Sequence, residues 1–69
     1  MGLEKLVAPM PGVVIAVQVS AKQIVRKGEP LLVLEAMKME NTINSEADGI
    51  IHRILVKEGE TVKKGQELL

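Results

Sequence analysis

Short apolar runs, separated by turns that contain glycine or proline, follow one another along the whole chain. The runs at 13–19 ("VVIAVQV") and 50–56 ("IIHRILV") are rich in β-branched residues, which favour strands. No segment keeps the 3.6-residue apolar period of an amphipathic helix over ten residues. The pattern predicts strands near 4–8, 13–19, 31–36, 40–45, 50–56 and 67–69, with short ones near 24–26 and 61–63.

The chain contains an internal repeat. When the sequence is shifted by 37 residues (49 minus 12), residues 12–32 overlay residues 49–69 without a gap. Seven of the 21 pairs are identical: Gly12/Gly49, Val19/Val56, Val25/Val62, Lys27/Lys64, Gly28/Gly65, Leu31/Leu68 and Leu32/Leu69. We therefore expect two similar β-units that pack about a pseudo-two-fold axis.

One position departs from this repeat in a way that affects the backbone. Lys22 stands where the second half has Gly59. A turn that needs a positive φ is easily made by glycine and is strained for lysine. We therefore expect the loop around Lys22 to differ in shape from the loop around Gly59.

The segment "VLEAMKMEN" (33–41) is ambiguous, because its Leu, Glu, Ala, Met and Lys residues all favour a helix. The repeat favours a different structure, since this segment joins the two symmetric halves and is flanked by strands. We expect a β-hairpin with Met37 and Lys38 as its two central residues.

This hairpin has a definite register. It places Ala36 opposite Met39, Glu35 opposite Glu40, Leu34 opposite Asn41 and Leu32 opposite Ile43. One mostly apolar face results, which we assign to the core: Leu32, Leu34, Ala36, Met39 and Ile43, interrupted by Asn41.

The tip of the hairpin violates two local rules. A two-residue hairpin prefers positive φ at both central residues, which suits neither Met37 nor Lys38. Two glutamates that face each other across a ladder also repel. Because sequences usually break local rules at functional sites, the tip is the candidate site, with Lys38 pointing into solvent.

Composition narrows the function further. A chain of 69 residues with no cysteine and no aromatic residue forms one small domain with an aliphatic core and no disulfide. Nine basic and nine acidic residues give zero net charge, which argues against a nucleic-acid partner. The apolar runs are too short for membrane insertion.

No acid, base and nucleophile are grouped in the sequence as an enzyme needs, and no metal-ligand cluster is visible. We therefore expect neither catalytic nor metal-binding residues.

The motif "EAMKME" at 35–40 resembles the biotin-attachment motif of biotinyl domains, the biotin carboxyl carrier modules of biotin-dependent carboxylases and decarboxylases. The flanking segments "APMPG" (8–12) and "DGIIHRILVKEGETVKKGQELL" (48–69) resemble the same family, so the likeness covers nearly the whole chain.

The resemblance implies an all-β fold, a flattened β-barrel or barrel-sandwich hybrid of two four-stranded antiparallel sheets with quasi-two-fold symmetry. It implies a single carrier domain over residues 1–69, excised from a larger carboxylase or forming a subunit of one. It also implies that Lys38 carries covalent biotin. The flanking residues that a biotin ligase would recognise are Glu35, Ala36, Met37, Met39 and Glu40.

The function implied by the resemblance is that of a carrier and not of an enzyme. A biotin protein ligase would attach biotin to Lys38 from biotinyl-adenylate. The biotin would then act as a swinging arm that carries carboxybiotin between biotin carboxylase (or decarboxylase) and carboxyltransferase domains or subunits, such as those of acyl-CoA carboxylases. We expect the domain in the cytoplasm, or in the mitochondrial matrix if the organism is a eukaryote.

Two alternatives share the β-fold. Lipoyl carrier domains also display a lysine at a hairpin tip, but typically between Asp and Ala, so Met37 and Met39 argue against that interpretation. An unmodified module that binds a protein partner through the Met37/Met39 tip is the other alternative. It leaves the hexapeptide and its position midway between the two repeats as coincidences.

Overall fold

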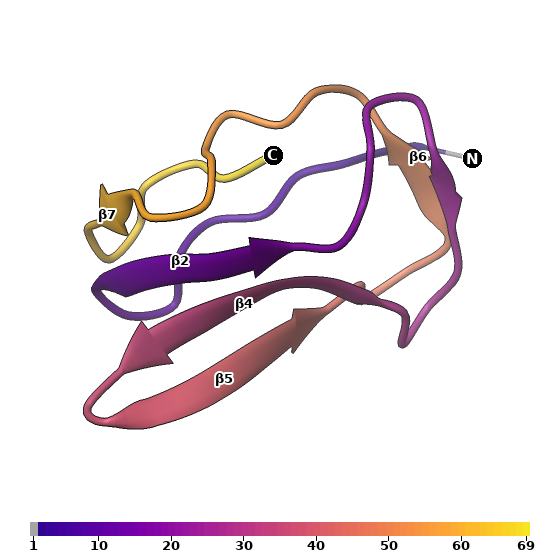
Figure 1. The fold of residues 1–69 in the computed structure, drawn as a ribbon. Helices are drawn as coiled ribbons and strands as arrows, with labels where there is room; N and C mark the ends of the chain where they lie inside the picture. The colour runs from indigo at the N-terminus through magenta and orange to yellow at the C-terminus, as the bar shows by residue number, and fades with distance from the viewer. Residues whose placement is uncertain (1) are drawn as a thin grey trace.

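A computed structural model describes residues 2–69 of the chain, with side chains from residue 5 onward. Its seven strands are β1 (Gly2–Glu4), β2 (Gly12–Val17), β3 (Ile24–Val25), β4 (Pro30–Ala36), β5 (Met39–Asn44), β6 (Gly49–Ile51) and β7 (Thr61–Val62). They form a four-stranded sheet in the order β5-β4-β2-β7 and a three-stranded sheet in the order β1-β6-β3 (Figure 1). The described residues contain no helix, so the prediction of an all-β fold is confirmed.

Strand β4 lies inside the four-stranded sheet and pairs antiparallel with β2 on one side and β5 on the other. Four successive residues of this strand, 31–34, are buried, so both of its faces are covered. Burial of both faces explains why its sequence is a continuous apolar run instead of an alternating one. Strand β2 is irregular between Val14 and Ala16, and Ile15 at this point is 38% exposed.

The three-stranded sheet differs from the expected antiparallel one. Strand β6 pairs antiparallel with β3 but parallel with β1. The predicted strand 50–56 ends at Ile51, and the predicted strand 67–69 is reduced to a single bridge between Glu67 and Val7. The two halves differ in their pairing: β2 pairs with β4 as far as Val17, whereas the pairing of β6 with β1 and β3 stays within Gly49–Ile51.

The core consists of two aliphatic clusters. One contains Ala8, Val14, Leu32, Leu34, Val56, Val62 and Leu68, and the other contains Val19, Val25, Leu31, Ile51 and Leu69. Four identical pairs of the repeat are buried here, and the two members of each pair lie in different clusters: Val19/Val56, Val25/Val62, Leu31/Leu68 and Leu32/Leu69. The repeat therefore specifies the core, because each half contributes equivalent apolar residues to it.

The loop around Lys22 has the same hydrogen bonding as its counterpart, so the expectation of a different shape is wrong. The Lys22 N–H donates to the carbonyl of Ile51 at 2.6 Å, and the Gly59 N–H donates to the carbonyl of Val14 at 2.8 Å. Both residues have positive φ, 69° at Lys22 and 88° at Gly59. The hydrogen bond from Lys22 to Ile51 holds the loop in this turn, and lysine accepts the strain that glycine avoids.

Replacing Lys22 with glycine should therefore stabilise the domain or leave its stability unchanged. Relief of the left-handed strain is worth about 1–3 kcal/mol and is partly offset by the greater freedom of glycine in the unfolded chain. The matched control Lys63→Gly changes another exposed lysine, one without positive φ, and should cost about 0.5–1 kcal/mol. Urea denaturation of both variants measures the difference, and equal losses would contradict the strain at Lys22.

Gly12 is required for a different reason, which is lack of space. A Cβ at this position would lie 2.5 Å from the Glu35 carbonyl oxygen and 3.3 Å from the Ala36 Cβ. We expect Gly12→Ala to lower the free energy of unfolding by about 1–3 kcal/mol. A Cβ on Gly59, where φ is +88°, would meet no other group within 4 Å, so Gly59→Asn should cost less than about 1 kcal/mol. Thermal melting that ranks the two variants in the opposite order would refute the close contact.

Candidate functional site

The candidate site is the turn that joins β4 to β5. Two residues form it, Met37 with φ 55° and Lys38 with φ 64°. Positive φ at both central residues is the mark of a type I′ hairpin turn, whose twist matches that of the flanking strands. The predicted register is confirmed, with Ala36 opposite Met39 and Glu35 opposite Glu40. The helix suggested by local propensity does not form.

The turn displays its side chains to solvent. Met37 is 89% exposed and Met39 is 64% exposed, and Lys38 between them is exposed as well. Among the described residues, the Lys38 amine has no hydrogen-bond or ion-pair partner. Figure 1 shows the hairpin tip projecting at the end of the four-stranded sheet, away from β6. A primary amine is thus presented at the apex, with a thioether on each side.

The apolar pattern of the hairpin predicts Met39 in the core, and this prediction is wrong. Strand β5 is an edge strand, and along it only Asn41 and Ile43 are partly buried. Burial on β4 ends with Ala36, which is 7% exposed. The last pair of the hairpin therefore extends past the core, and Met39 projects into solvent opposite a buried alanine.

Asn41 has a structural use that the sequence did not reveal. Its side-chain Nδ2 donates to the carbonyl of Met39 at 3.2 Å and to the carbonyl of Leu34 across the hairpin at 3.5 Å. In the sequence pattern this residue is only an interruption of an apolar face. Its predicted position opposite Leu34, close to the turn, is the signal that could have identified it as a residue that hydrogen-bonds the backbone next to the turn.

The acidic residues near the tip are both exposed. Glu35 and Glu40 face each other across the ladder, as the register predicts. The close packing of Gly12 against the Glu35 carbonyl fixes the backbone of β4 directly before the turn. The site therefore consists of an ordered hairpin end that carries one amine, two thioethers and two carboxylates.

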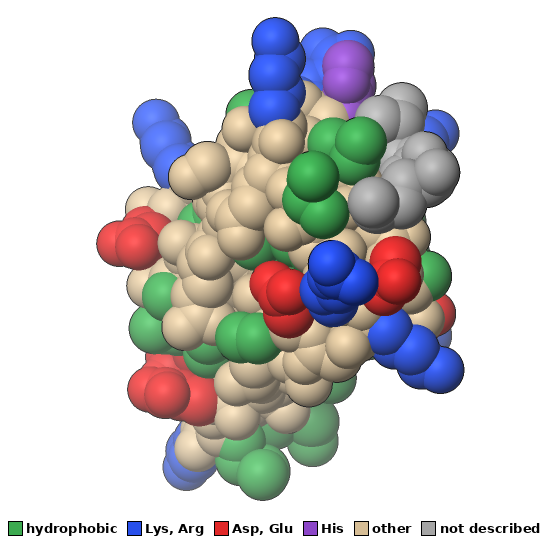
Figure 2. Space-filling view, turned by 90° about the vertical axis from the view of Figure 1, so that its right-hand side faces the viewer, with side chains coloured by type: hydrophobic (Ala, Val, Ile, Leu, Met, Phe, Trp, Pro, Cys, Tyr) green, Lys and Arg blue, Asp and Glu red, His purple; other side chains and the backbone are tan. Residues whose placement is uncertain are grey.

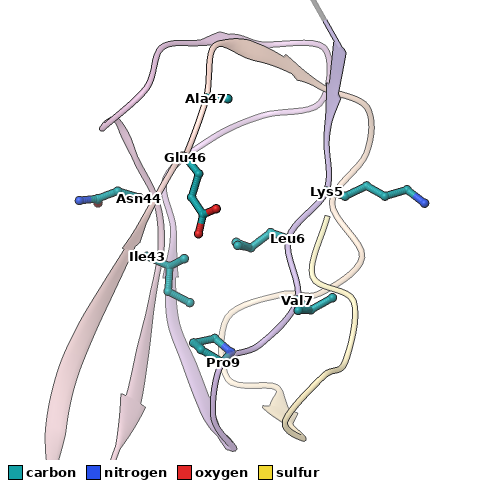
Figure 3. A pocket seen from close by; sticks show the side chains of 8 residues that line it. All are labelled: Lys5, Leu6, Val7, Pro9, Ile43, Asn44, Glu46 and Ala47. Atoms are coloured by element: carbon teal, nitrogen blue, oxygen red, sulfur yellow. The ribbon is translucent and has the colours of Figure 1, made fainter.

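A hollow of about 500 Å³ lies elsewhere on the molecule and includes none of the tip residues. Its lining comes from the segment after β1 and from the far end of β5: Lys5, Leu6, Val7, Pro9, Ile43, Asn44, Glu46 and Ala47. Figure 3 shows Leu6, Ile43 and Glu46 pointing into it, whereas Lys5 and Asn44 point away. It offers apolar walls and one carboxylate, without a grouping of reactive side chains.

The rest of the described surface gives no sign of a second kind of site. On the face in Figure 2, acidic and basic side chains are interspersed and hydrophobic ones gather in small patches. Among the side chains of residues 5–69, no three of His, Cys, Asp or Glu are grouped to hold a metal ion. The same part of the chain contains no helix with the length and apolar character needed to cross a membrane.

Comparison with known proteins identifies the family of this chain. A family model described as "Biotin-requiring enzyme", which covers biotin and lipoyl domains, matches residues 4–69. Since the match includes almost all of the sequence, the chain belongs to the family of biotin- and lipoyl-carrying domains of biotin-requiring enzymes.

Named relatives are similar to this chain over most of its length. The methylmalonyl-CoA decarboxylase subunit gamma of Veillonella parvula is 54% identical over 50 residues, which is 72% of this chain and 39% of the relative. The biotin carboxyl carrier protein of Streptococcus mutans is 44% identical over 62 residues, which is 90% of this chain and 48% of the relative. The chain thus spans less than half the length of either relative.

Two solved structures are similar in fold. A single-chain, multi-domain long-chain acyl-CoA carboxylase matches 96% of this chain with 7% of its own, at a TM-score of 0.88 and 33% identity. The lipoyl domain of the 2-oxoglutarate dehydrogenase complex from Azotobacter vinelandii matches 93% of this chain with 89% of its own, at a TM-score of 0.81 and 28% identity.

These likenesses confirm the prediction of a biotin carrier domain and of biotin as its cofactor. The relative named biotin carboxyl carrier protein indicates a domain that is not itself the catalyst. The lipoyl alternative shares the fold but has less support. The lipoyl domain is 28% identical to this chain, whereas the relative named biotin carboxyl carrier protein is 44% identical over 90% of it.

The turn itself can be tested by giving it the residues that its backbone prefers. Asn and Gly are favoured at the two central positions of a type I′ turn. We expect the double change Met37→Asn with Lys38→Gly to raise the free energy of unfolding by about 1 kcal/mol or more, because it relieves two left-handed residues. Thr42→Asn, an exposed change within β5, should lower it. If urea denaturation shows no gain for the turn variant, the left-handed turn is refuted.

Proposed function

We propose that this domain is a biotin carboxyl carrier and that Lys38 is the residue to which biotin is attached. The observation that carries the proposal is the exposed amine at the apex of the left-handed Met37–Lys38 turn. A covalently attached group that must reach two active sites needs an amine that is free of partners and stands on an ordered support. The Lys38 amine meets both conditions, so the residues present fit the cofactor.

Attachment would proceed by amide formation in the active site of a biotin protein ligase. The Lys38 Nζ attacks the acyl carbon of biotinyl-adenylate, the bond from that carbon to the phosphate oxygen breaks, AMP leaves, and the amine loses a proton. Because Met37 and Met39 are exposed beside the lysine, their thioethers offer a soft apolar surface to the ligase. Glu35 and Glu40 add exposed charges, whereas Ala36 is buried and contributes by fitting closely against β2.

The attached biotin supplies the chemistry of carrying activated CO₂, and the chain supplies its position. Tethering to Lys38 raises the effective concentration of the cofactor at each active site that the arm can reach. The partners would be biotin carboxylase (or decarboxylase) and carboxyltransferase domains or subunits. We place the domain in the cytoplasm, or in the mitochondrial matrix if the organism is a eukaryote.

We further propose that residues 1–69 form one carrier domain of a larger carboxylase, with the quasi-two-fold flattened barrel expected of the family. Hydrogen bonds that recur at the 37-residue shift support the symmetry. The Gly28 N–H donates to the carbonyl of Ser45, and the Gly65 N–H donates to the carbonyl of Ala8, both at 2.8 Å.

The pairing of strands recurs at the same shift. The bridge between Val7 and Glu67 is the counterpart of the pair formed by Asn44 and Pro30 at the start of β4, so it also supports the symmetry.

The proposal predicts that Lys38→Arg folds normally but is not biotinylated, because the guanidinium keeps the charge and loses the nucleophilic amine. Intact mass after incubation with biotin protein ligase, ATP and biotin should increase by one biotin less one water in the parent chain only. Lys22→Arg, at the other positive-φ lysine, is the matched control and should still be modified. Modification of Lys38→Arg would exclude Lys38 as the attachment site, and labelling by lipoate ligase alone would favour the lipoyl alternative.

A further inference from the structure

We propose that Met37 and Met39 form a peroxide-sensitive modification site, and that oxidation of their thioethers switches off recognition of the hairpin tip. The inference rests on the proposed function, since the switched event is biotin attachment at Lys38. It starts from an unusual placement: two flexible apolar side chains stand 89% and 64% exposed on either side of one lysine.

Exposure makes these two methionines the reactive ones among those whose side chains are described. Oxidation of methionine by peroxides follows the accessibility of the sulfur. Met10, which lies between Pro9 and Pro11, is only partly exposed and serves as an internal reference. We therefore expect oxidation in the order Met37, then Met39, then Met10.

The chemistry needs only a peroxide as the oxidant. A lone pair of the thioether sulfur attacks one peroxide oxygen, the O–O bond breaks, and the sulfur keeps that oxygen as a sulfoxide. Hydrogen peroxide supplies the oxygen and is reduced to water, while the sulfur loses two electrons. Methionine sulfoxide reductases return the sulfoxide to the thioether: a dithiol reductant supplies two electrons and becomes a disulfide, and the oxygen leaves as water. The change can therefore act as a switch.

Oxidation would change the tip without unfolding the domain. The exposed thioether side chains lie outside both core clusters, so a sulfoxide there removes no core packing. The turn depends on backbone pairing between Ala36 and Met39, which does not involve sulfur. Oxidation therefore changes only the surface of the hairpin tip, which a ligase or a carboxylase partner would contact.

The effect at the tip has two physical causes. A sulfoxide is polar, so a partner pocket shaped for a thioether loses apolar contact and must desolvate an oxygen. The sulfoxide oxygen is also a hydrogen-bond acceptor. Lys38, whose amine has no partner among the described residues, is the chain neighbour of both methionines. A sulfoxide that reached this amine would compete for the group that must attack the acyl carbon.

Tryptic peptide mapping of the unmodified chain can measure the order of oxidation directly. Cleavage after lysine and arginine separates the three methionines into peptides 6–22, 28–38 and 39–53. After brief treatment with hydrogen peroxide, we expect Met37 to oxidise at least about threefold faster than Met10. Equal rates at Met10 and Met37 would overturn the assignment of the site.

The functional consequence is measured as the ratio of biotinylation rates after and before peroxide. We expect kcat/KM of biotin protein ligase for the oxidised chain to fall by about tenfold and to recover after treatment with methionine sulfoxide reductases. Met37→Leu with Met39→Leu should give a ratio near one, whatever its starting rate. Met10→Leu should remain as sensitive as the parent.

The outcomes separate the two proposals. An unchanged rate for a chain whose Met37 and Met39 are fully oxidised would overturn the switch while leaving the carrier function intact. A chain that takes no biotin before oxidation would refute the proposed function and the switch with it, and the peptide map would still decide whether the tip is the oxidation site. A lasting loss in the double leucine variant would place the sensitive group elsewhere.

Discussion

The pairing of Ala36 with Met39 is the constraint on which the rest of the site depends. It leaves two residues to close the hairpin, and two-residue closure forces Met37 and Lys38 into left-handed conformations. Each such residue costs roughly 1–3 kcal/mol when it is not glycine. The turn persists because β4 is buried on both faces and paired on both sides, so its end cannot shift without disrupting the sheet.

The same constraint gives the Lys38 amine a fixed place on the molecule. An amine on a disordered loop would have no fixed position, and an amine in the sheet would lack reach. The closed turn places Lys38 at a defined point beyond the core, and Asn41 binds the carbonyls just below it. Local rules are commonly broken at functional sites, and the strained turn at Met37 and Lys38 is such a break.

Much of this arrangement could be predicted from the sequence. The repeat and the midpoint position of Met37 and Lys38 gave the register correctly, because side-chain alternation leaves few acceptable pairings. The prediction that Met39 lies in the core was wrong. The alternation of apolar and polar residues shows which face of the sheet a side chain is on, but it does not show where along an edge strand the core ends. The prediction for the Lys22 loop was wrong because it relied on the preference of lysine for negative φ, and the surrounding structure overrides that preference. The short β6 could not be foreseen, because strand length depends on which neighbour is present to pair with it.

The ordered left-handed turn at Met37 and Lys38 can be measured by NMR. Scalar and residual dipolar couplings on the unmodified, isotope-labelled chain report φ, and 15N relaxation reports order. We expect positive φ at both residues and order parameters near the value of about 0.85 that is usual for rigid backbone. Averaged couplings and order parameters below about 0.6 at these two residues would show a flexible tip and refute the ordered turn.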